Sequence, residues 1–271
     1  MTHKQITDNI ELDLGLKLLT QSFTDVAAIK LQRIRRGIER NRNFISEVSG
    51  LFAAVKKLTK ERSAVPDSKK KGGVAILVTS NYHFYGGLER RLMSFYLNTI
   101  KKLSIDSDLI GIDRLVIGQS GKEIFNYQSI VWKDDLPTEE DLKKLSNLVS
   151  DYQRILVFYP LFQSVLVQKP VVVDITEARN VEGQNQPKFE IDYILEPEIG
   201  RMWQFFENQI LKLLLDQTFL EAELSRTAAR LISMDQAREN AEIAISKLKK
   251  ALASAKRSID NIHILETESA M

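Results

Sequence analysis

The sequence predicts an α/β protein whose N-terminal and C-terminal segments form a long antiparallel coiled coil around an inserted domain with a mainly parallel sheet. Two observations lead to this prediction. The first and the last segment each repeat apolar residues at alternating steps of four and three, which is typical of coiled-coil helices. Between them, short apolar runs alternate with helical stretches, which is the order of elements in an α/β layer.

The C-terminal segment, residues 198–271, has the strongest helical signal. From residue 201 onward it contains neither glycine nor proline, the two residues that most weaken helices. A helix over residues 201–271 would be about 100 Å long, so we interpret it as a shaft that partners surround. Its seam has three polar members, Gln217, Thr227 and Arg238. The seam runs through Phe206, Ile210, Leu213, Gln217, Leu220, Leu224, Thr227, Leu231, Met234, Arg238, Ala241, Ile245, Leu248, Leu252, Ala255, Ile259 and Ile262.

The N-terminal segment, residues 1–62, predicts a second long helix from about residue 10, because it contains no proline. Two successive steps of four, from Phe23 through Ala27 to Leu31, predict a stutter that locally unwinds the supercoil. The cheapest way to bury two apolar seams of one chain is to pack them antiparallel against each other. The predicted seam runs through Leu12, Leu16, Leu19, Phe23, Ala27, Leu31, Ile34, Ile38, Asn41, Ile45, Val48, Phe52 and Val55.

A basic collar lies on the polar face of this N-terminal helix. It is either a solvated helix face or a surface for acidic loops of a partner. The collar consists of Lys30, Arg33, Arg36 and Arg40.

The pattern of residues 73–197 predicts a Rossmann-like α/β domain, which follows a polar linker containing Pro66. Apolar runs of strand length are buried parallel strands in such folds. We expect strands at 74–79, 109–117, 154–159 and 171–175, a short strand at 130–132, an edge strand at 188–195, and helices at 88–103, 121–127 and 137–152.

Composition excludes several classes of function. The chain has no cysteine, and its three histidines are far apart, so we expect no metal site, no cofactor and no disulfide. A net charge of +2 is too small to indicate a nucleic-acid partner. No apolar run approaches 18 residues and no basic start precedes an apolar run, so we expect neither a membrane span nor a signal peptide.

Two motifs suggest enzyme chemistry, but neither is complete. Gly118-Gln-Ser-Gly121-Lys122 resembles a phosphate loop that is two residues too short, and Glu123 stands where a magnesium-binding hydroxyl is needed. His83 follows a predicted strand, where α/β enzymes bind ligands, but no nucleophile or acid pair accompanies it. We therefore predict no catalytic residues. Two alternatives stay open: a ligand-binding α/β enzyme that dimerises through coiled coils, and a coiled-coil scaffold or tether.

Five blocks along the chain, in order, resemble the gamma subunit of the F-type ATP synthase. They are Thr20-Gln-Ser-Phe23-Thr-Asp-Val26-Ala27-Ala28-Ile-Lys30-Leu31, the strand end and turn Val78 to Leu88 with Gly86 and Gly87, Ile117-Gly118-Gln-Ser-Gly121, Tyr193-Ile-Leu-Glu196-Pro197, and Ala228-Ala229-Arg230-Leu231-Ile-Ser-Met234-Asp-Gln-Ala237-Arg-Glu-Asn240.

The chain departs from the family at two places. The family's Asp-Arg-Gly-Leu-Cys segment is replaced by Asn81-Tyr-His-Phe-Tyr85, and the family's final pattern survives only partly around Ile259. These departures are compatible with a diverged family member that serves an F1-like ATPase and not the synthase itself.

The resemblance implies a non-catalytic central rotor shaft, which couples ATP hydrolysis or synthesis to rotation and hydrogen-ion transport. The implied partners are a hexamer of alpha- and beta-type ATPase subunits, a small epsilon-type subunit and a c-ring. The implied location is peripheral, on the cytoplasmic face of the cell membrane, held through the complex. The resemblance and the collar together predict these partner contacts: Thr20, Phe23, Val26, Lys30, Arg33, Arg36, Arg40, Gly86, Gly87, Tyr193, Glu196, Arg230, Met234, Asn240 and Ile259.

Overall fold

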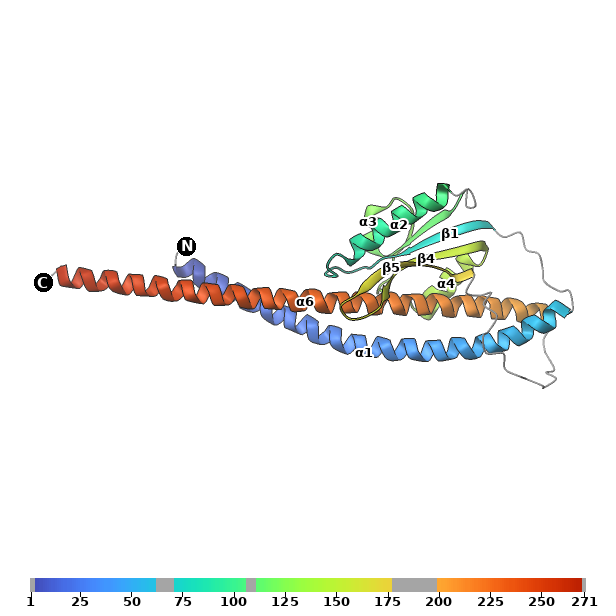
Figure 1. Ribbon diagram of the computed structural model, residues 1–271, viewed down its shortest axis with the longest axis horizontal. Helices are drawn as coiled ribbons and strands as arrows, with labels where there is room; N and C mark the ends of the chain where they lie inside the picture. The colour runs from blue at the N-terminus through green and yellow to red at the C-terminus, as the bar shows by residue number, and fades with distance from the viewer. Residues whose placement is uncertain (1–2, 62–70, 106–110, 177–198, 270–271) are drawn as a thin grey trace. The chain divides into compact units, whose positions relative to one another are not determined.

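The structure is a computed structural model, which describes residues 3–61, 71–105, 111–176 and 199–269. Two long helices enclose the elements of the sheet in sequence order (Figure 1). The elements are α1 (His3–Glu61), β1 (Lys71–Val78), α2 (Leu88–Ile105), β2 (Asp113–Ile117), α3 (Gln119–Ile124), β3 (Gln128–Ile130), α4 (Glu139–Val149), β4 (Tyr152–Phe162), β5 (Gln168–Asp174) and α6 (Ile199–Ser269).

The chain divides into two compact units, and both long helices run through each of them. The first unit comprises Met1–Lys30 with Arg230–Met271, and the second comprises Leu31–Ala229. The second unit contains the sheet and its helices together with the C-terminal half of α1 and the N-terminal part of α6, which pair with each other. Each unit has its own packing.

The sheet of the second unit has five strands in the order β3-β2-β1-β4-β5. All neighbouring pairs are parallel except β4 and β5, which run antiparallel. The prediction of an α/β fold with a mainly parallel sheet is confirmed. The predicted edge strand at 188–195 lies outside the described residues.

The two faces of the sheet carry separate apolar cores, because successive side chains of a strand point to opposite faces. Ala75 and Leu77 of β1 pack with Leu92 and Tyr96 of α2. Val74, Ile76 and Val78 face α4 and α6 instead; on α6 their cluster contains Leu211, Leu215, Phe219 and Ala222. The alternating strand β1 therefore joins α2 on one face to α4 and α6 on the other (Figure 1).

In the second unit, α6 lies between the sheet and α1 (Figure 1). The side of α6 that faces α1 is the predicted seam: Leu224 packs with Ile34 and Ile38, and Ile210 packs with Val48. Higher numbers on α1 meet lower numbers on α6, so the pair is antiparallel, as predicted. The seam pattern does not predict the second apolar side of α6, which covers the sheet.

The predicted seam of α1 is wrong in the first unit. Its four leucine and phenylalanine members, Leu12, Leu16, Leu19 and Phe23, are between 47% and 70% exposed. No stutter is needed, because the alternating steps of four and three continue back from Ala27 along a different row of α1. Four positions of that row are polar. The continuing seam consists of Ile6, Ile10, Asp13, Lys17, Thr20, Thr24 and Ala27, all buried or half-buried.

Candidate functional site

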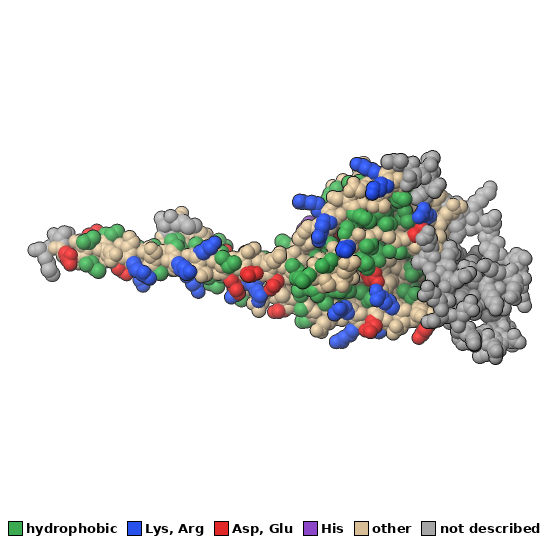
Figure 2. Space-filling model, in the orientation of Figure 1, with side chains coloured by type: hydrophobic (Ala, Val, Ile, Leu, Met, Phe, Trp, Pro, Cys, Tyr) green, Lys and Arg blue, Asp and Glu red, His purple; other side chains and the backbone are tan. Residues whose placement is uncertain are grey.

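An apolar stripe on α1 is the clearest candidate surface of the first unit. Its members recur at steps of four and three, and their exposed fractions are 70%, 47%, 60%, 47% and 62% in sequence order. The stripe consists of Leu12, Leu16, Leu19, Phe23 and Val26. Each member precedes a seam position by one residue, so the stripe lies about 100° around the helix from the side that meets α6. Figure 2 shows apolar side chains at the surface of the helices, among charged ones.

The side of α1 that meets α6 in the first unit is polar at four positions. Lys17 forms an ion pair of 3.0 Å with Glu242 of α6. Thr20 is 4% exposed, and its hydroxyl donates a hydrogen bond of 2.9 Å to the carbonyl oxygen of Leu16. Thr24 donates in the same way to the carbonyl oxygen of Thr20, at 2.9 Å. This segment is inside out for a coiled coil: polar groups face the partner helix, while large apolar ones face outward.

The basic collar follows the stripe along α1. Arg33, Arg36 and Arg40 are exposed, whereas Lys30 is half-buried. Arg40 Nε donates a hydrogen bond of 3.4 Å to the carbonyl oxygen of Arg36. The collar thus presents three guanidinium groups at the surface, and such groups bind carboxylates through charge-assisted hydrogen bonds.

The predicted contacts on α6 differ in exposure. Asn240 is exposed, and Ile259 is 46% exposed. Met234 is 7% exposed, and Arg230 is half-buried. Two further predicted contacts, Tyr193 and Glu196, lie outside the described residues.

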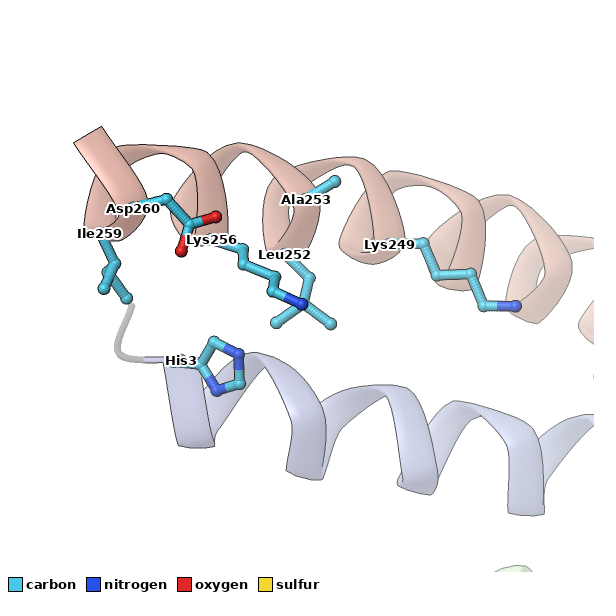
Figure 3. A pocket seen from close by; sticks show the side chains of 7 residues that line it. All are labelled: His3, Lys249, Leu252, Ala253, Lys256, Ile259 and Asp260. Carbon is cyan, nitrogen blue, oxygen red and sulfur yellow. The ribbon is translucent and has the colours of Figure 1, made fainter. Parts of the chain in front are cut away.

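A groove of about 620 Å³ lies between α1 and the C-terminal part of α6 in the first unit (Figure 3). His3 contributes one side, and the rest comes from α6. The lining residues of α6 are Lys249, Leu252, Ala253, Lys256, Ile259 and Asp260. Ile259 is therefore both a predicted contact and part of a groove with two ammonium groups.

The loop from Asn81 to Gly87 is the second candidate surface. Asp135 holds its base, because its carboxylate accepts hydrogen bonds from the Ser80 hydroxyl at 2.7 Å and the Tyr85 hydroxyl at 2.9 Å. Phe84, at the tip, is 67% exposed and has a φ of 72°, which is rare for a bulky residue. Gly86 has a φ of 58°, a conformation that favours glycine. The exposed side chains of this loop thus stand on a fixed base.

The phosphate-loop resemblance has a structural explanation that involves no ligand. A Cβ on Gly118 would lie 2.4 Å from the carbonyl oxygen of Thr79, and a Cβ on Gly121 would lie 2.4 Å from Val116 Cγ1. The Gly121 amide donates a hydrogen bond of 3.0 Å to the Thr79 hydroxyl. Both glycines are therefore required by the close approach of this turn to the end of β1.

A buried charge cluster occupies the place where α/β folds bind ligands. That place is the crevice at the carboxyl ends of the strands where the strand order reverses, here between β1 and β4. Arg226 of α6, 0% exposed, donates from Nη2 to the carbonyl oxygen of Val78 at 2.9 Å. Its Nε lies 3.3 Å from Glu89 Oε1 and its Nη1 lies 3.7 Å from Glu223 Oε2. An internal side chain thus fills this crevice.

Burial and charge act in opposite directions within this cluster. Burial alone would lower the pKa of Arg226, but the carboxylates of Glu89, Asp135 and Glu223 raise it, so the guanidinium stays charged. Burial raises the pKa of Glu89, even though the charge of Arg226 lowers it. The sequence does not single out these residues, because the charges around Arg226 follow a pattern that is equally typical of an exposed helix face.

Neither a metal centre nor a membrane span is found in the parts of the chain that the structure describes. Among those residues, no three His, Cys, Asp or Glu side chains are grouped so that they could hold a metal ion. None of the helices described is long and apolar enough to cross a bilayer. His83 is exposed and belongs to the loop surface described above.

Comparisons with known proteins point to one family. The family model described as "ATP synthase" matches residues 3–258. The ATP synthase gamma chain of Staphylococcus haemolyticus is 23% identical over 263 residues, which cover 90% of this chain and 89% of the relative. The gamma chain of Pasteurella multocida is 25% identical over 277 residues and covers 94% and 93%.

Solved structures share the fold. The rotor of the mitochondrial ATP synthase of Euglena gracilis has a TM-score of 0.58 at 13% identity, covering 95% of this chain and 99% of that chain. The central stalk and c-ring structure from Tetrahymena thermophila contains a chain with a TM-score of 0.54 at 19% identity, covering 81% and 99%. Since the family match extends over nearly the whole sequence, this chain belongs to the ATP synthase family, and the curated relatives named above are gamma chains.

Proposed function

We propose that this chain is the central rotor shaft of a rotary F-type ATP synthase or F1-like ATPase. It is a non-catalytic subunit: ATP is made or hydrolysed on partner subunits, and the chain couples that reaction to rotation. The gamma-chain relatives and the rotor and central-stalk neighbours support this role. They favour it over the two alternatives left open by the residue patterns, a ligand-binding enzyme and a coiled-coil tether.

The single observation that carries the proposal is the apolar stripe of the inside-out segment. Large apolar side chains that face away from α6 lose the hydrophobic stabilisation that burial would give, about 25 cal/mol per Å². A contiguous exposed apolar patch marks an interaction surface. A ring of ATPase subunits that surrounds α1 would cover this stripe by apolar contact, which is non-directional and therefore compatible with turning.

The collar gives the second, charged part of this interface. Arg33, Arg36 and Arg40 would meet acidic loops of the catalytic subunits, where opposite charges guide register without tight apolar packing. Phe23, Val26 and Lys30 lie on the same helix within or beside the stripe, whereas Thr20 is 4% exposed and faces α6. Arg230, Asn240 and Ile259 would be the corresponding contacts along α6, whereas Met234, at 7% exposed, is buried within this chain.

The mechanism follows from the asymmetry of the shaft. Because apolar and charged side chains are unevenly distributed around α1, the surrounding subunits would contact different surfaces of the shaft and be held in different states. ATP binding and hydrolysis change which state is favoured in each subunit, and the shaft turns to match, which is a population shift coupled to rotation.

The α/β domain would form the foot of the rotor. A neighbour whose title contains "central stalk/cring" supports a c-ring as a partner. The resemblance to the gamma subunit implies a small epsilon-type subunit beside it. The loop with Gly86 and Gly87, together with Tyr193 and Glu196, would contribute foot contacts. The chain would then be peripheral, on the cytoplasmic face of the cell membrane, and the complex would carry hydrogen ions across it.

A native-mass measurement on tagged chain purified from its own cells tests this proposal. We expect one copy of the chain with three copies each of two ATPase-sized subunits. Phe23→Asp should reduce that association, because it places a charge in the stripe. Leu166→Asp is the matched control: Leu166 is 78% exposed and lies outside the stripe, so its variant should assemble like the wild type.

Three results would contradict the proposal. The first is a stable homodimer without ATPase subunits, which is the result that a tether predicts. The second is ATP hydrolysis by the purified chain alone. The third is a nucleotide or flavin that raises the melting temperature of the isolated chain, as expected for a ligand-binding enzyme.

A further inference from the structure

The buried guanidinium of Arg226 connects α6 to two elements that are far from it in sequence, β1 and α2. It donates to the Val78 carbonyl oxygen at the end of β1, at 2.9 Å, and it pairs with Glu89 in the first turn of α2, at 3.3 Å. Glu223, one turn earlier on α6, lies 3.7 Å from it. We propose that Arg226 is the positioning residue that fixes the angle of the α/β domain on α6, so that helix and domain turn as one body. This inference rests on the rotor function proposed above.

The apolar contacts at this junction cannot by themselves set that angle. Leu211, Leu215, Phe219 and Ala222 lie in the apolar core under the sheet. Apolar burial is non-directional, so it resists separation much more than it resists a small rotation or slide. The guanidinium is planar and meets three partners at fixed angles: Nη2 donates a hydrogen bond to the Val78 carbonyl oxygen, and Nε and Nη1 lie at ion-pair distance from Glu89 and Glu223.

Burial increases the cost of leaving that geometry. Arg226 is 0% exposed and Glu223 is 1% exposed, so water cannot replace a lost partner without opening the core. Separating a buried pair leaves an uncompensated charge in an apolar surrounding, which is strongly unfavourable. The cluster therefore favours one register of α6 against β1 and α2 over neighbouring registers.

The place of the cluster also suits this role. It lies at the reversal of strand order between β1 and β4, and Glu221 of α6 accepts a hydrogen bond of 3.0 Å from Tyr159 of β4. The helix is thus tied to both strands that border the crevice. Torque that passes between α6 and the sheet therefore acts on these directional contacts as well as on the apolar core.

The test uses the assembled complex with its head fixed to a surface. The natural chain has no cysteine, so Lys122→Cys on the exposed side of α3 gives one attachment point for a bead on the α/β domain. Angular fluctuations of the bead with rotation stalled measure the torsional stiffness between head and domain. Arg226→Met keeps the bulk of the side chain and removes its charge, and we expect the variance of the bead angle to rise at least about twofold.

Arg154→Met is the matched control. Arg154 forms an ion pair of 2.6 Å with Asp174, a pair that joins β4 to β5 and does not involve α6. This variant should have the wild-type variance, even if its melting temperature falls. Arg226→Lys keeps the positive charge but lacks the planar guanidinium, and it replaces Arg226→Met as the test if that variant does not assemble. Its bead angle should also have a larger variance than in the wild type.

The outcomes separate the two proposals. Wild-type stiffness in assembled Arg226→Met, or in Arg226→Lys where the first variant does not assemble, overturns the role of Arg226. Equal loosening in Arg154→Met overturns it too, because the effect would then be a general softening of the domain. A wild-type chain that assembles with no ATPase subunits, or whose bead does not rotate with ATP, overturns the rotor function itself.

Discussion

Glu221 of α6 accepts a hydrogen bond of 3.0 Å from the hydroxyl of Tyr159 in β4. The same carboxylate accepts from Gln217 Nε2 at 2.7 Å and from Arg42 Nη2 of α1 at 3.0 Å. Glu221 is 8% exposed, so one nearly buried carboxylate joins the sheet, α6 and α1. Burial and then the charge of Glu221 raise the pKa of Tyr159, which keeps its hydroxyl protonated as a donor.

Tyr159→Phe removes one of the three donors to Glu221 and should lower the free energy of unfolding. A hydrogen bond to a charged group contributes about 1.5–3 kcal/mol, and two donors remain, so we expect a loss near the lower value. Urea unfolding followed by circular dichroism measures it. Tyr152→Phe is the control: its bond of 2.6 Å to Asp113 is exposed, and its loss should be smaller. A larger loss in the control would contradict this account.

Tyr96→Phe should leave the protein at least as stable at pH 7. The Tyr96 ring is 0% exposed and packs edge-on against Phe158 at 4.9 Å, but its hydroxyl has no hydrogen-bond partner among the described residues. A buried polar group without a partner costs about 1–3 kcal/mol, and the phenylalanine removes it. Thermal unfolding checks this, and a loss of stability would show that the hydroxyl has a partner.

The same variant should change the response to alkaline pH. Burial raises the pKa of Tyr96 to about 12, above its ordinary value of 10.0. The neutral phenol is the form that the fold favours, so its contribution is complete below pH 10 and is lost as the pH rises towards 12. Stability measured from pH 9 to 12 should therefore fall less steeply in Tyr96→Phe than in the wild type. Equal slopes would contradict this assignment.

Two glycine-to-alanine substitutions should act in opposite directions. Gly121→Ala places a Cβ 2.4 Å from Val116 Cγ1 and 2.8 Å from Thr79 Oγ1, and such overpacking costs about 1–3 kcal/mol. Gly15→Ala lies in α1, where nothing is within 4 Å of the new Cβ, and alanine is favoured in a helix by about 1 kcal/mol. Melting temperatures of both variants test the prediction. A stabilising Gly121→Ala would show that β1 and β2 yield readily at this turn.

A pair of serine substitutions tests the corrected seam of α1. Ile34 is 5% exposed, so Ile34→Ser should cost several kcal/mol, about 2–5 by analogy with other core truncations. Phe23 is 47% exposed, so Phe23→Ser should change the stability of the isolated chain by at most about 0.5 kcal/mol. Denaturant unfolding of the unassembled chain separates the two. A loss in Phe23→Ser as large as that in Ile34→Ser would restore the seam that the apolar pattern predicts.

The sequence predicts much of this fold because its strongest signals are local. The apolar run that begins at Val74 specifies a buried strand, and the absence of glycine and proline after residue 200 specifies one helix. The charged first turn at Glu139 marks the start of α4, where Thr138 and Asp141 form a capping box. These features depend on neighbouring residues only, so a single sequence contains them.

The contacts that were missed depend on which side of a helix is covered. Phe23 and Thr20 belong to two neighbouring rows of α1 that have the same heptad spacing. The row with the apolar residues is the natural choice for a seam, yet Thr20 is buried and Phe23 is exposed. A partner that covers the stripe reverses the usual preference, and a single sequence does not contain the partner. Arg226 is missed for a related reason, because an arginine among glutamates on a helix is most often solvated.

The position of α6 between two cores also limits how this chain can vary. Between residues 210 and 229 one side of the helix packs under the sheet and the other packs on α1, and every residue from Glu221 to Ala229 is buried. A substitution there must fit two sets of neighbours at once. A substitution near Ile262, which is 53% exposed, meets neighbouring side chains mainly when partner subunits bind. Saturation mutagenesis of α6 should therefore give two regimes: intolerance in the unassembled chain across 210–229, and intolerance that arises only on assembly towards the C-terminus.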